Sequence, residues 1–177
     1  SEDGSKLAVA IQAENYADTG RVALFTCNAD GTLTFDKVYE TGVQPDMVTS
    51  ASNASKILTA DEGEPRDGYG DGIIDPKGTV TIINLADQTV SQVDFTSYDN
   101  SDSREQLVES GVILKKNTNP SVDFEPEYIA VGDKTAYVTL QEANAIAVID
   151  LNQQSLTGVY SAGYEDYSTC AVDILSL

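Results

Sequence analysis

The run Asp61-Glu62-Gly63-Glu64-Pro65-Arg66 concentrates side chains that could do chemistry. Three carboxylates and one arginine follow an apolar run, and the glycine and proline indicate a strand that ends in a turn. Carboxylate oxygens bind hard divalent cations, and arginine binds phosphate. The run therefore predicts a metal or phosphate site with Arg66 as the phosphate clamp. The alternative is a loop in which Arg66 neutralises a neighbouring carboxylate.

The next segment, Asp67-Gly68-Tyr69-Gly70-Asp71-Gly72-Ile73-Ile74-Asp75, partly matches a calcium-binding loop. It has acids at the first, fifth and ninth positions and glycine at the sixth, as in EF-hand loops. Tyr69 occupies the third position, and Gly78 stands where the bidentate glutamate belongs. The acid-rich stretch predicts a calcium site, with a solvated glycine-rich loop as the alternative. The predicted metal ligands in it are Asp61, Glu62, Glu64, Asp67, Asp71 and Asp75.

A third group of acids flanks a proline in Phe124-Glu125-Pro126-Glu127-Tyr128-Ile129. The run Val43-Gln44-Pro45-Asp46-Met47-Val48 has the same order of residue types, and proline suits the first residue of a strand. We predict a structural role for Gln44 and Asp46, as caps of backbone N–H groups in the neighbouring repeat. The functional residues predicted here are Glu125 and Glu127 as metal ligands, with Gln141 and Glu142 as ligand-binding residues.

Composition excludes several kinds of chemistry. The 177 residues contain no histidine, which removes Ser-His-Asp and Cys-His catalysis and histidine-bound zinc. Cys27 and Cys170 form no CxxC pair, and a buried free thiol is predicted for Cys27, with a disulfide as the alternative. The net charge of −19 argues against nucleic acid and anionic membranes as partners. No apolar run is long enough for a transmembrane helix.

Three segments of the chain share one pattern, in which two β-rich runs flank a turn that bears acids or amides. A weaker third strand follows each pair across a hairpin turn, and the proline motif opens a further strand before the second and third pairs. The paired runs are 7–15 with 20–25, 56–64 with 78–85, and 136–144 with 145–151. The third strands are 34–39, 89–95 and 155–160.

Four short strands in about 40 residues is the period of a β-propeller blade. The sequence predicts an all-β fold, a β-propeller with lactonase-like repeats and about three four-stranded blades, and a β-sandwich is the alternative. The predicted blades are 1–48, 49–123 and 124–177 of a single unit, 1–177. Inserts at 65–77 and 99–123 interrupt the period. Residues 103–110 suit a short helix that is capped by Ser103 and ended by Gly111.

The acidic, polar start of the chain lacks the features of a signal peptide and suits a turn inside a domain. We therefore expect a fragment of a larger propeller. Propellers protect their sheet edges by closing the ring, so a fragment leaves one blade edge unpaired. Self-association through that edge is expected.

Four longer runs of sequence are specific enough to compare with known families: 60–66, 75–80, 124–131 and 136–147. They resemble the choice-of-anchor I family of secreted or surface-anchored bacterial propeller domains. Some members are called alkaline phosphatase-like or mesenchyme-specific cell-surface glycoprotein-like. The resemblance covers essentially the whole chain and implies a propeller in an extracellular or cell-surface setting. Calcium-dependent propeller phytases and phosphatases are related more distantly, by architecture.

The function predicted from these observations is that of a surface module that binds a ligand or acts as a scaffold. Ca²⁺ is its candidate metal, and a surface ligand or small molecule is its expected partner. The alternative is a metal-dependent phosphoesterase of the alkaline phosphatase or phytase type that uses the acidic residues as ligands. We expect neither nucleic acid binding nor direct membrane insertion.

Overall fold

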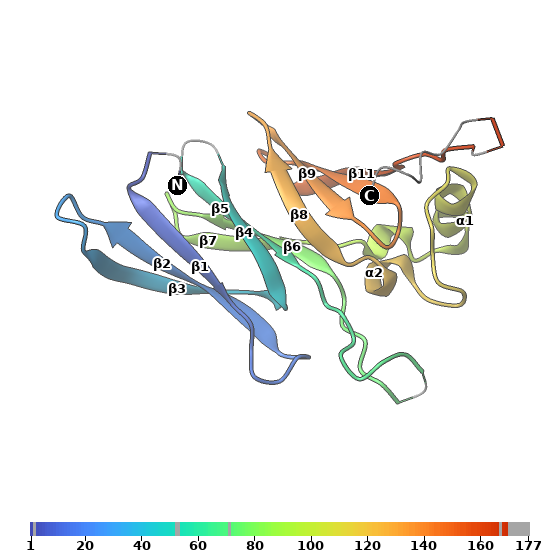
Figure 1. Ribbon diagram of the computed structural model, residues 1–177, viewed down its shortest axis with the longest axis horizontal. Coiled ribbons are helices and arrows are strands. Elements are labelled where there is room, and N and C mark those ends of the chain that lie inside the picture. The colour runs from blue at the N-terminus through green and yellow to red at the C-terminus, as the bar shows by residue number, and fades with distance from the viewer. Residues whose placement is uncertain (2, 52–53, 71, 167, 170–177) are drawn as a thin grey trace, which may run out of the picture.

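The computed structural model describes residues 1, 3–51, 54–70, 72–166 and 168–169, which fold into three antiparallel sheets (Figure 1). Each sheet is a meander of consecutive strands, and the predicted all-β class is confirmed. The first sheet contains β1 (Lys6–Ile11), β2 (Thr19–Cys27) and β3 (Leu33–Val43). The second contains β4 (Pro45–Ala51), β5 (Lys56–Asp61), β6 (Thr79–Asn84) and β7 (Thr89–Val93). The third contains β8 (Pro126–Val131), β9 (Thr135–Leu140), β10 (Ala145–Asp150) and β11 (Ser155–Ser161).

Aspartates hold the tight turns of the hairpins that the sequence predicts. The Asp30 carboxylate accepts from the Thr32 N–H at 3.0 Å, and the Asp87 carboxylate accepts from the Thr89 N–H at 3.1 Å. In the third sheet, the Asp150 carboxylate accepts from two backbone N–H groups of the turn. A short carboxylate that bonds two residues ahead stabilises a turn, which is why these residues lie between the strands.

The second sheet lies between the other two, and its central strands β5 and β6 are buried on both faces (Figure 1). One face, which includes Ile57 and Ile83, packs against the first sheet. The opposite face belongs to a larger core shared with the third sheet. The side chains that line that core are Leu58, Ala60, Val80 and Ile82 from the second sheet, and Ala136, Val138, Leu140 and Ala147 from the third.

The strand register places the repeats in a definite alignment. Gly20-Arg21-Val22 matches Gly78-Thr79-Val80, and Ile11 pairs with Arg21 as Asp61 pairs with Thr79. The two prolines of the proline motif pair with Asp61 and with Leu140. Ile11, Asp61 and Leu140 are therefore equivalent residues. The second repeat accordingly starts at Ile57, one residue later than the sequence pattern predicted.

The first sheet differs from the predicted four-stranded blade. Among the residues that the structure describes, only three strands form it, and β1 has no strand paired on its outer edge. The boundary predicted between residues 48 and 49 falls inside β4, because the proline motif opens the second sheet rather than ending the first. Cys27 is a half-buried free thiol at the end of β2, whereas Cys170 lies outside the described residues.

The insert at 99–123 contains the predicted helix, α1 (Ser101–Glu109), with a different start. Asn100 rather than Ser103 caps it, and the Asn100 side chain accepts from the Ser103 N–H at 2.9 Å. Gly111 follows the last turn with a φ of +100°, which favours glycine and explains why the helix ends there. Two short helices were not predicted. η1 (Thr96–Tyr98) lies just before the insert, and α2 (Pro120–Asp123) forms its end.

The longer insert completes the core rather than hanging free of it. Leu107 and Val112 from the longer insert are buried, and Phe95 and Phe124 at its ends meet edge to face with ring centroids 5.2 Å apart. None of the helices in the described ranges is long and apolar enough to cross a membrane.

Candidate functional site

Four acid-bearing segments meet at one end of the second and third sheets because of strand direction. Antiparallel pairing places the start of β4 beside the end of β5, and the start of β8 beside the end of β9. β8 in turn packs against β4 and β5, and the Ile129 N–H lies 2.9 Å from the Met47 sulfur. The proline motifs and the turns after β5 and β9 are therefore neighbours in space, although Asp46 and Glu142 are 142 − 46 = 96 positions apart in the chain.

We call the carboxylates gathered there the acidic cluster. Its members are Asp46, Glu62, Glu64, Glu125, Glu127 and Glu142. Five of them were predicted from the sequence as metal-binding or ligand-binding residues. Asp46 was predicted to be structural, and the signal that could have identified it is its match to Glu127 in the proline motif.

Burial and repulsion by neighbouring carboxylates raise the pKa values of Glu62, Glu125 and Glu127. Burial, followed by repulsion from Asp46 and Glu64, raises the pKa of Glu62 to about 7. The pKa of Glu127 is raised by burial and then by Glu142 and Asp46. These glutamates therefore resist ionisation unless a positive charge comes near.

Two basic side chains face this group of acids. The Arg66 guanidinium lies 2.7 Å from the Glu64 carboxylate and 3.2 Å from that of Glu62, and its Nε donates to the Gln44 side-chain oxygen at 3.2 Å. This is the salt-bridged loop that was the alternative interpretation of the run 61–66. With two carboxylates and one amide already on it, the guanidinium has little capacity left to clamp a phosphate.

The second basic side chain, Lys115, comes from the longer insert, and no sequence signal marked it. Its ammonium lies 3.1 Å from the Glu125 carboxylate and 3.3 Å from that of Asp123. It also lies 4.2 Å from the centre of the Tyr69 ring, a cation–π contact. Lys115 thus joins the two inserts at the base of β8.

Asp61 lies outside the acidic cluster, in the core between the first and second sheets, and is fully buried. Its carboxylate accepts hydrogen bonds from four donors, which are the hydroxyls of Thr59, Thr79 and Thr81 and the N–H of Gly42. Burial outweighs these bonds and raises the pKa of Asp61 to about 6. A Cβ on Gly42 would lie 2.7 Å from the Asp61 carboxylate, so glycine is required there. We assign Asp61 a structural role.

The predicted calcium-loop residues lie in different surroundings. Asp67 is close to Tyr16, whose pKa is raised first by burial and then by that carboxylate. Asp75 lies near Lys115 and Asp123, and burial is the main cause of its raised pKa. Asp71 falls outside the described residues. Within the described ranges, no group of three or more Asp, Glu, Cys or His side chains is arranged to hold a metal ion.

The remaining predicted residues have clear places. Gln44 is buried with a φ of +55°, and its amide donates to the carbonyl oxygens of Tyr16 at 3.1 Å and of Glu64 at 2.6 Å. Its role is structural, but it pairs with backbone carbonyls rather than with the predicted N–H groups. Gln141 and Glu142 are exposed in the turn after β9, and Glu142 faces Glu127.

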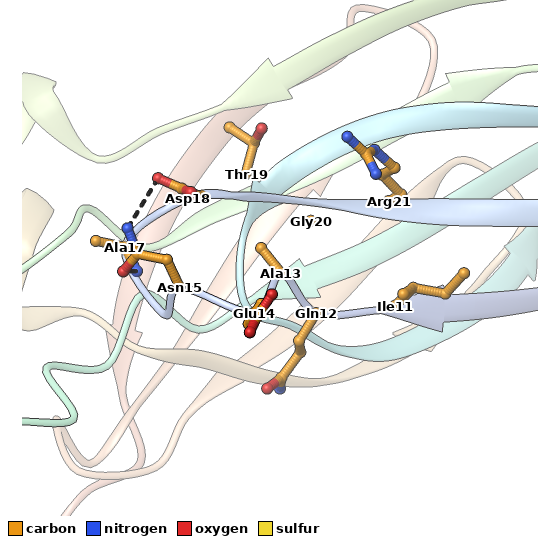
Figure 2. A pocket seen from close by; sticks show the side chains of 10 residues that line it. All are labelled: Ile11, Gln12, Ala13, Glu14, Asn15, Ala17, Asp18, Thr19, Gly20 and Arg21. Atoms are coloured by element: carbon orange, nitrogen blue, oxygen red, sulfur yellow. Dashed lines mark hydrogen bonds between the residues drawn. The ribbon is translucent and has the colours of Figure 1, made fainter.

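A separate hollow of about 770 Å³ lies in the connection between β1 and β2 (Figure 2). Its lining residues all belong to this one hairpin, and Asn15 donates to Asp18 across the loop at 3.2 Å. The sequence predicted no functional residue there. The hollow brings no second segment of the chain to a bound molecule.

No curated protein matches the chain. Among solved structures, it is similar to a chain in the crystal structure of a nidogen/laminin complex, at 12% sequence identity and a TM-score of 0.46. The match covers 89% of this chain and 43% of that one, so the chain spans less than half of that protein. The family model of the choice-of-anchor I domain matches residues 1–176, and the chain therefore belongs to that family.

Proposed function

We propose that this chain is part of a surface-associated β-propeller that binds a divalent cation at the acidic cluster, with Ca²⁺ as the ion to test. The observation that carries the proposal is the meeting of six carboxylates from four segments, which face two basic side chains, Arg66 and Lys115. Family membership supports a surface-associated β-module, and we propose that its setting is extracellular.

The propeller part of the proposal is supported by how the sheets stack. Each four-stranded sheet is a meander, and the second sheet meets its two neighbours with opposite faces. The first strands of the second and third sheets, β4 and β8, lie against each other. Innermost strands that lie side by side around an axis are the arrangement of propeller blades.

The cation part is supported by electrostatics. Like charges near one another at reduced dielectric repel by about 4 kcal/mol at ~4 Å, and a divalent ion would convert that repulsion into attraction. Carboxylate oxygens are the ligands that Ca²⁺ prefers. Because the described side chains are not already arranged around an ion, they would have to draw together to coordinate it. Because Glu62 has a pKa of about 7, protons compete with the ion, and binding should strengthen as the pH rises through 7.

The experiment is a thermal melt of the chelator-treated protein with and without Ca²⁺. An ion that binds only the folded state stabilises it by about 2.7 kcal/mol at a hundred times its dissociation constant. We expect the melting temperature to rise with Ca²⁺, and the double variant Glu62→Gln/Glu127→Gln to lose that rise. Glu105→Gln, on the exposed side of α1, is the matched control and should keep it.

A second double variant separates the acidic cluster from the calcium-like loop. Asp67→Asn/Asp71→Asn should retain the calcium-dependent rise. If this variant loses the rise and the glutamate variant keeps it, the ion belongs to the loop and our assignment is wrong. If millimolar Ca²⁺ shifts the wild-type melt at no pH between 6 and 8, the cation-binding function fails altogether.

The phosphoesterase alternative stays a prediction without a supporting observation. A phosphate would approach six carboxylates, and the guanidinium predicted to clamp it already pairs with Glu62 and Glu64. Hydrolysis of an aryl phosphate by the protein with Ca²⁺, if it is abolished by a chelator, would support the phosphoesterase function.

A further inference from the structure

Lys115 is the point at which the two inserts and the acidic cluster meet. Its ammonium lies 3.1 Å from the Glu125 carboxylate and 3.1 Å from the Tyr69 hydroxyl, and it also lies over the Tyr69 ring. Tyr69 belongs to the shorter insert and Lys115 to the longer one, whereas Glu125 is a member of the acidic cluster just before β8. One side chain therefore holds three segments of the chain together.

The backbone of Lys115 is fixed, whereas its ammonium can change partners. The Lys115 N–H donates to the Asp123 carboxylate at 2.6 Å, and the Lys115 carbonyl accepts from the Arg104 guanidinium at 2.7 Å. The Lys115 side chain is 35% exposed, and lysine carries its charge on a flexible four-carbon stem. A fixed backbone with a flexible stem lets the charge move a short distance without disturbing the fold.

A second pair of carboxylates can receive this ammonium. The Asp123 Oδ1 atom lies 3.3 Å from it. After burial, the charges of Lys115 and Asp123 have the largest effects on the pKa of Asp75, so the three groups are neighbours. The Oδ1 atoms of Asp75 and Asp123 are buried and accept no hydrogen bond from the part of the chain that the structure describes. Buried carboxylate oxygens that lack a donor attract a nearby cation, so Lys115 has somewhere to go.

Glu125 is the carboxylate that Lys115 shares with the acidic cluster. Its side chain is 5% exposed. After burial and Lys115, the charges of Glu142 and Glu64 have the largest effects on its pKa. A cation held by these carboxylates would compete with the ammonium for the Glu125 oxygens and would also repel it. Occupation of the acidic cluster and the ion pair of Lys115 with Glu125 therefore oppose each other.

Tyr69 connects this competition to the shorter insert. One side of the insert is attached to the connection between β1 and β2, because the Tyr16 hydroxyl donates to the Ile74 carbonyl at 3.1 Å. Tyr69 is 59% exposed and lies between Gly68 and Gly70, two glycines with positive φ and open space around them. Its hydroxyl also reaches the Glu125 carboxylate, at 3.5 Å. Both of these Tyr69 partners are groups that a cation at the acidic cluster would disturb.

We infer that Lys115 is a built-in counter-ion that a divalent cation displaces from Glu125. When the cation occupies the acidic cluster, the Lys115 ammonium moves to Asp75 and Asp123, and the Tyr69 ring is released. The cation site thereby controls the middle of the shorter insert. The inference rests on the proposed cation binding and adds the means by which the bound state is transmitted. By linkage, Lys115 weakens cation binding by the same factor as the cation weakens the ion pair.

The first experiment uses fluorescence to follow the Tyr69 position. The chain contains no tryptophan, so Tyr69→Trp introduces a unique reporter, and a tryptophan ring keeps the cation–π contact with Lys115. When Ca²⁺ is added to the chelator-treated protein, acrylamide quenching should increase and the emission should shift to longer wavelength as the ring enters water. The midpoint of this change should coincide with that of the calcium-dependent rise in melting temperature, measured on the same protein.

Two controls show whether the change comes from Lys115. Tyr137→Trp, at an exposed tyrosine of β9, should report no change with Ca²⁺. In Tyr69→Trp/Lys115→Met, the introduced tryptophan should already be accessible in chelator, and Ca²⁺ should not alter its quenching further. An unchanged calcium response in that double variant would overturn the inference, because the ring would then move for another reason.

The second experiment measures the coupling from the other side. Lys115→Met removes the competing charge and should tighten Ca²⁺ binding at least about fivefold, the lower end of typical coupling between sites. Lys116→Met is the matched control, since it removes the same charge from the exposed neighbouring residue and should have a smaller effect. The titration of Tyr69→Trp does not depend on whether Lys115→Met folds.

The results separate this inference from the cation site itself. A calcium-dependent rise in the melting temperature of Tyr69→Trp with unchanged quenching would overturn the inference and leave the cation site in place. Loss of both responses would remove the cation site and the inference with it. Weaker Ca²⁺ binding by a folded Lys115→Met would also overturn the inference, because Lys115 would then position Glu125 for the ion rather than compete with it.

Discussion

Asp61 and Glu62 are neighbours in the chain, have raised pKa values, and lie in opposite kinds of environment. Asp61 is enclosed between two sheets by four hydrogen-bond donors, whereas Glu62 faces other carboxylates at the open end of the sheets. The first carboxylate accepts from four donors of its own protein, whereas the second has one cation, Arg66, and several carboxylates beside it. A raised pKa therefore does not by itself mark a binding site, and the neighbours of the group decide its role.

The largest effect expected from this comparison is that of Asp61→Ala. It removes the acceptor for three buried threonine hydroxyls, and unsatisfied buried donors cost about 1–3 kcal/mol each. We expect a loss of at least about 3 kcal/mol in the free energy of unfolding, measured by urea denaturation. Asp87→Ala, in an exposed turn, is the control and should cost less than about 1 kcal/mol. Equal losses at the two sites would remove the structural role of Asp61.

Gly42→Ala should have the next largest effect, because the added methyl would lie 2.7 Å from the Asp61 carboxylate. Overpacking of this kind costs about 1–3 kcal/mol. The same urea titration measures it. Gly31→Ala is the comparison, because Gly31 lies in a turn with open space around it. Its substitution costs free energy of folding through its φ of +83° rather than through overpacking.

The pH dependence of stability tests both regions together. The pKa of Asp61 is about 6 and that of Glu62 about 7 in the folded protein, each above its ordinary value of 3.8 or 4.5. Between these ordinary pKa values and the raised ones, the folded state therefore binds more protons than the unfolded state. Stability from these groups is fully present below pH ~4 and is lost as the pH rises through 6–7, with a slope of at most about 1.4 kcal/mol per pH unit for each proton.

The measurement is the free energy of unfolding at pH 5 and pH 8 in chelator, compared between wild type and Glu62→Gln. The variant should show a smaller decrease, since one of the two groups no longer titrates. A decrease that is identical in the two proteins would mean that Glu62 does not contribute.

The smallest effect is expected from relieving repulsion at the surface. Glu127→Gln removes a charge that Glu142, Asp46 and Glu125 repel, and should stabilise the metal-free protein by roughly 0.5 kcal/mol. Arg66→Gln should destabilise it, because the guanidinium offsets Glu62 and Glu64. A destabilising Glu127→Gln would show that this carboxylate has a partner that outweighs its neighbours.

The sequence predicted the strands and the proline motifs because both depend on local residue types. It identified Glu125 and Glu127 because their proline places them at a strand start. It misassigned Asp61, since the three threonines and Gly42 that surround it come from three strands, and only the fold brings them together. Lys115 was missed for the same reason, because its partners lie in the other insert and at the start of β8.

The connection between β5 and β6 has a consequence for the order in which the molecule folds. The turn between β9 and β10 spans residues 141–144, whereas residues 62–78 separate β5 from β6. The entropy lost on closing a loop grows with its length, and pairings distant in sequence form later. We therefore expect the second sheet to form last. Both outer sheets pack on it, so the shorter insert sets the rate at which the whole stack assembles.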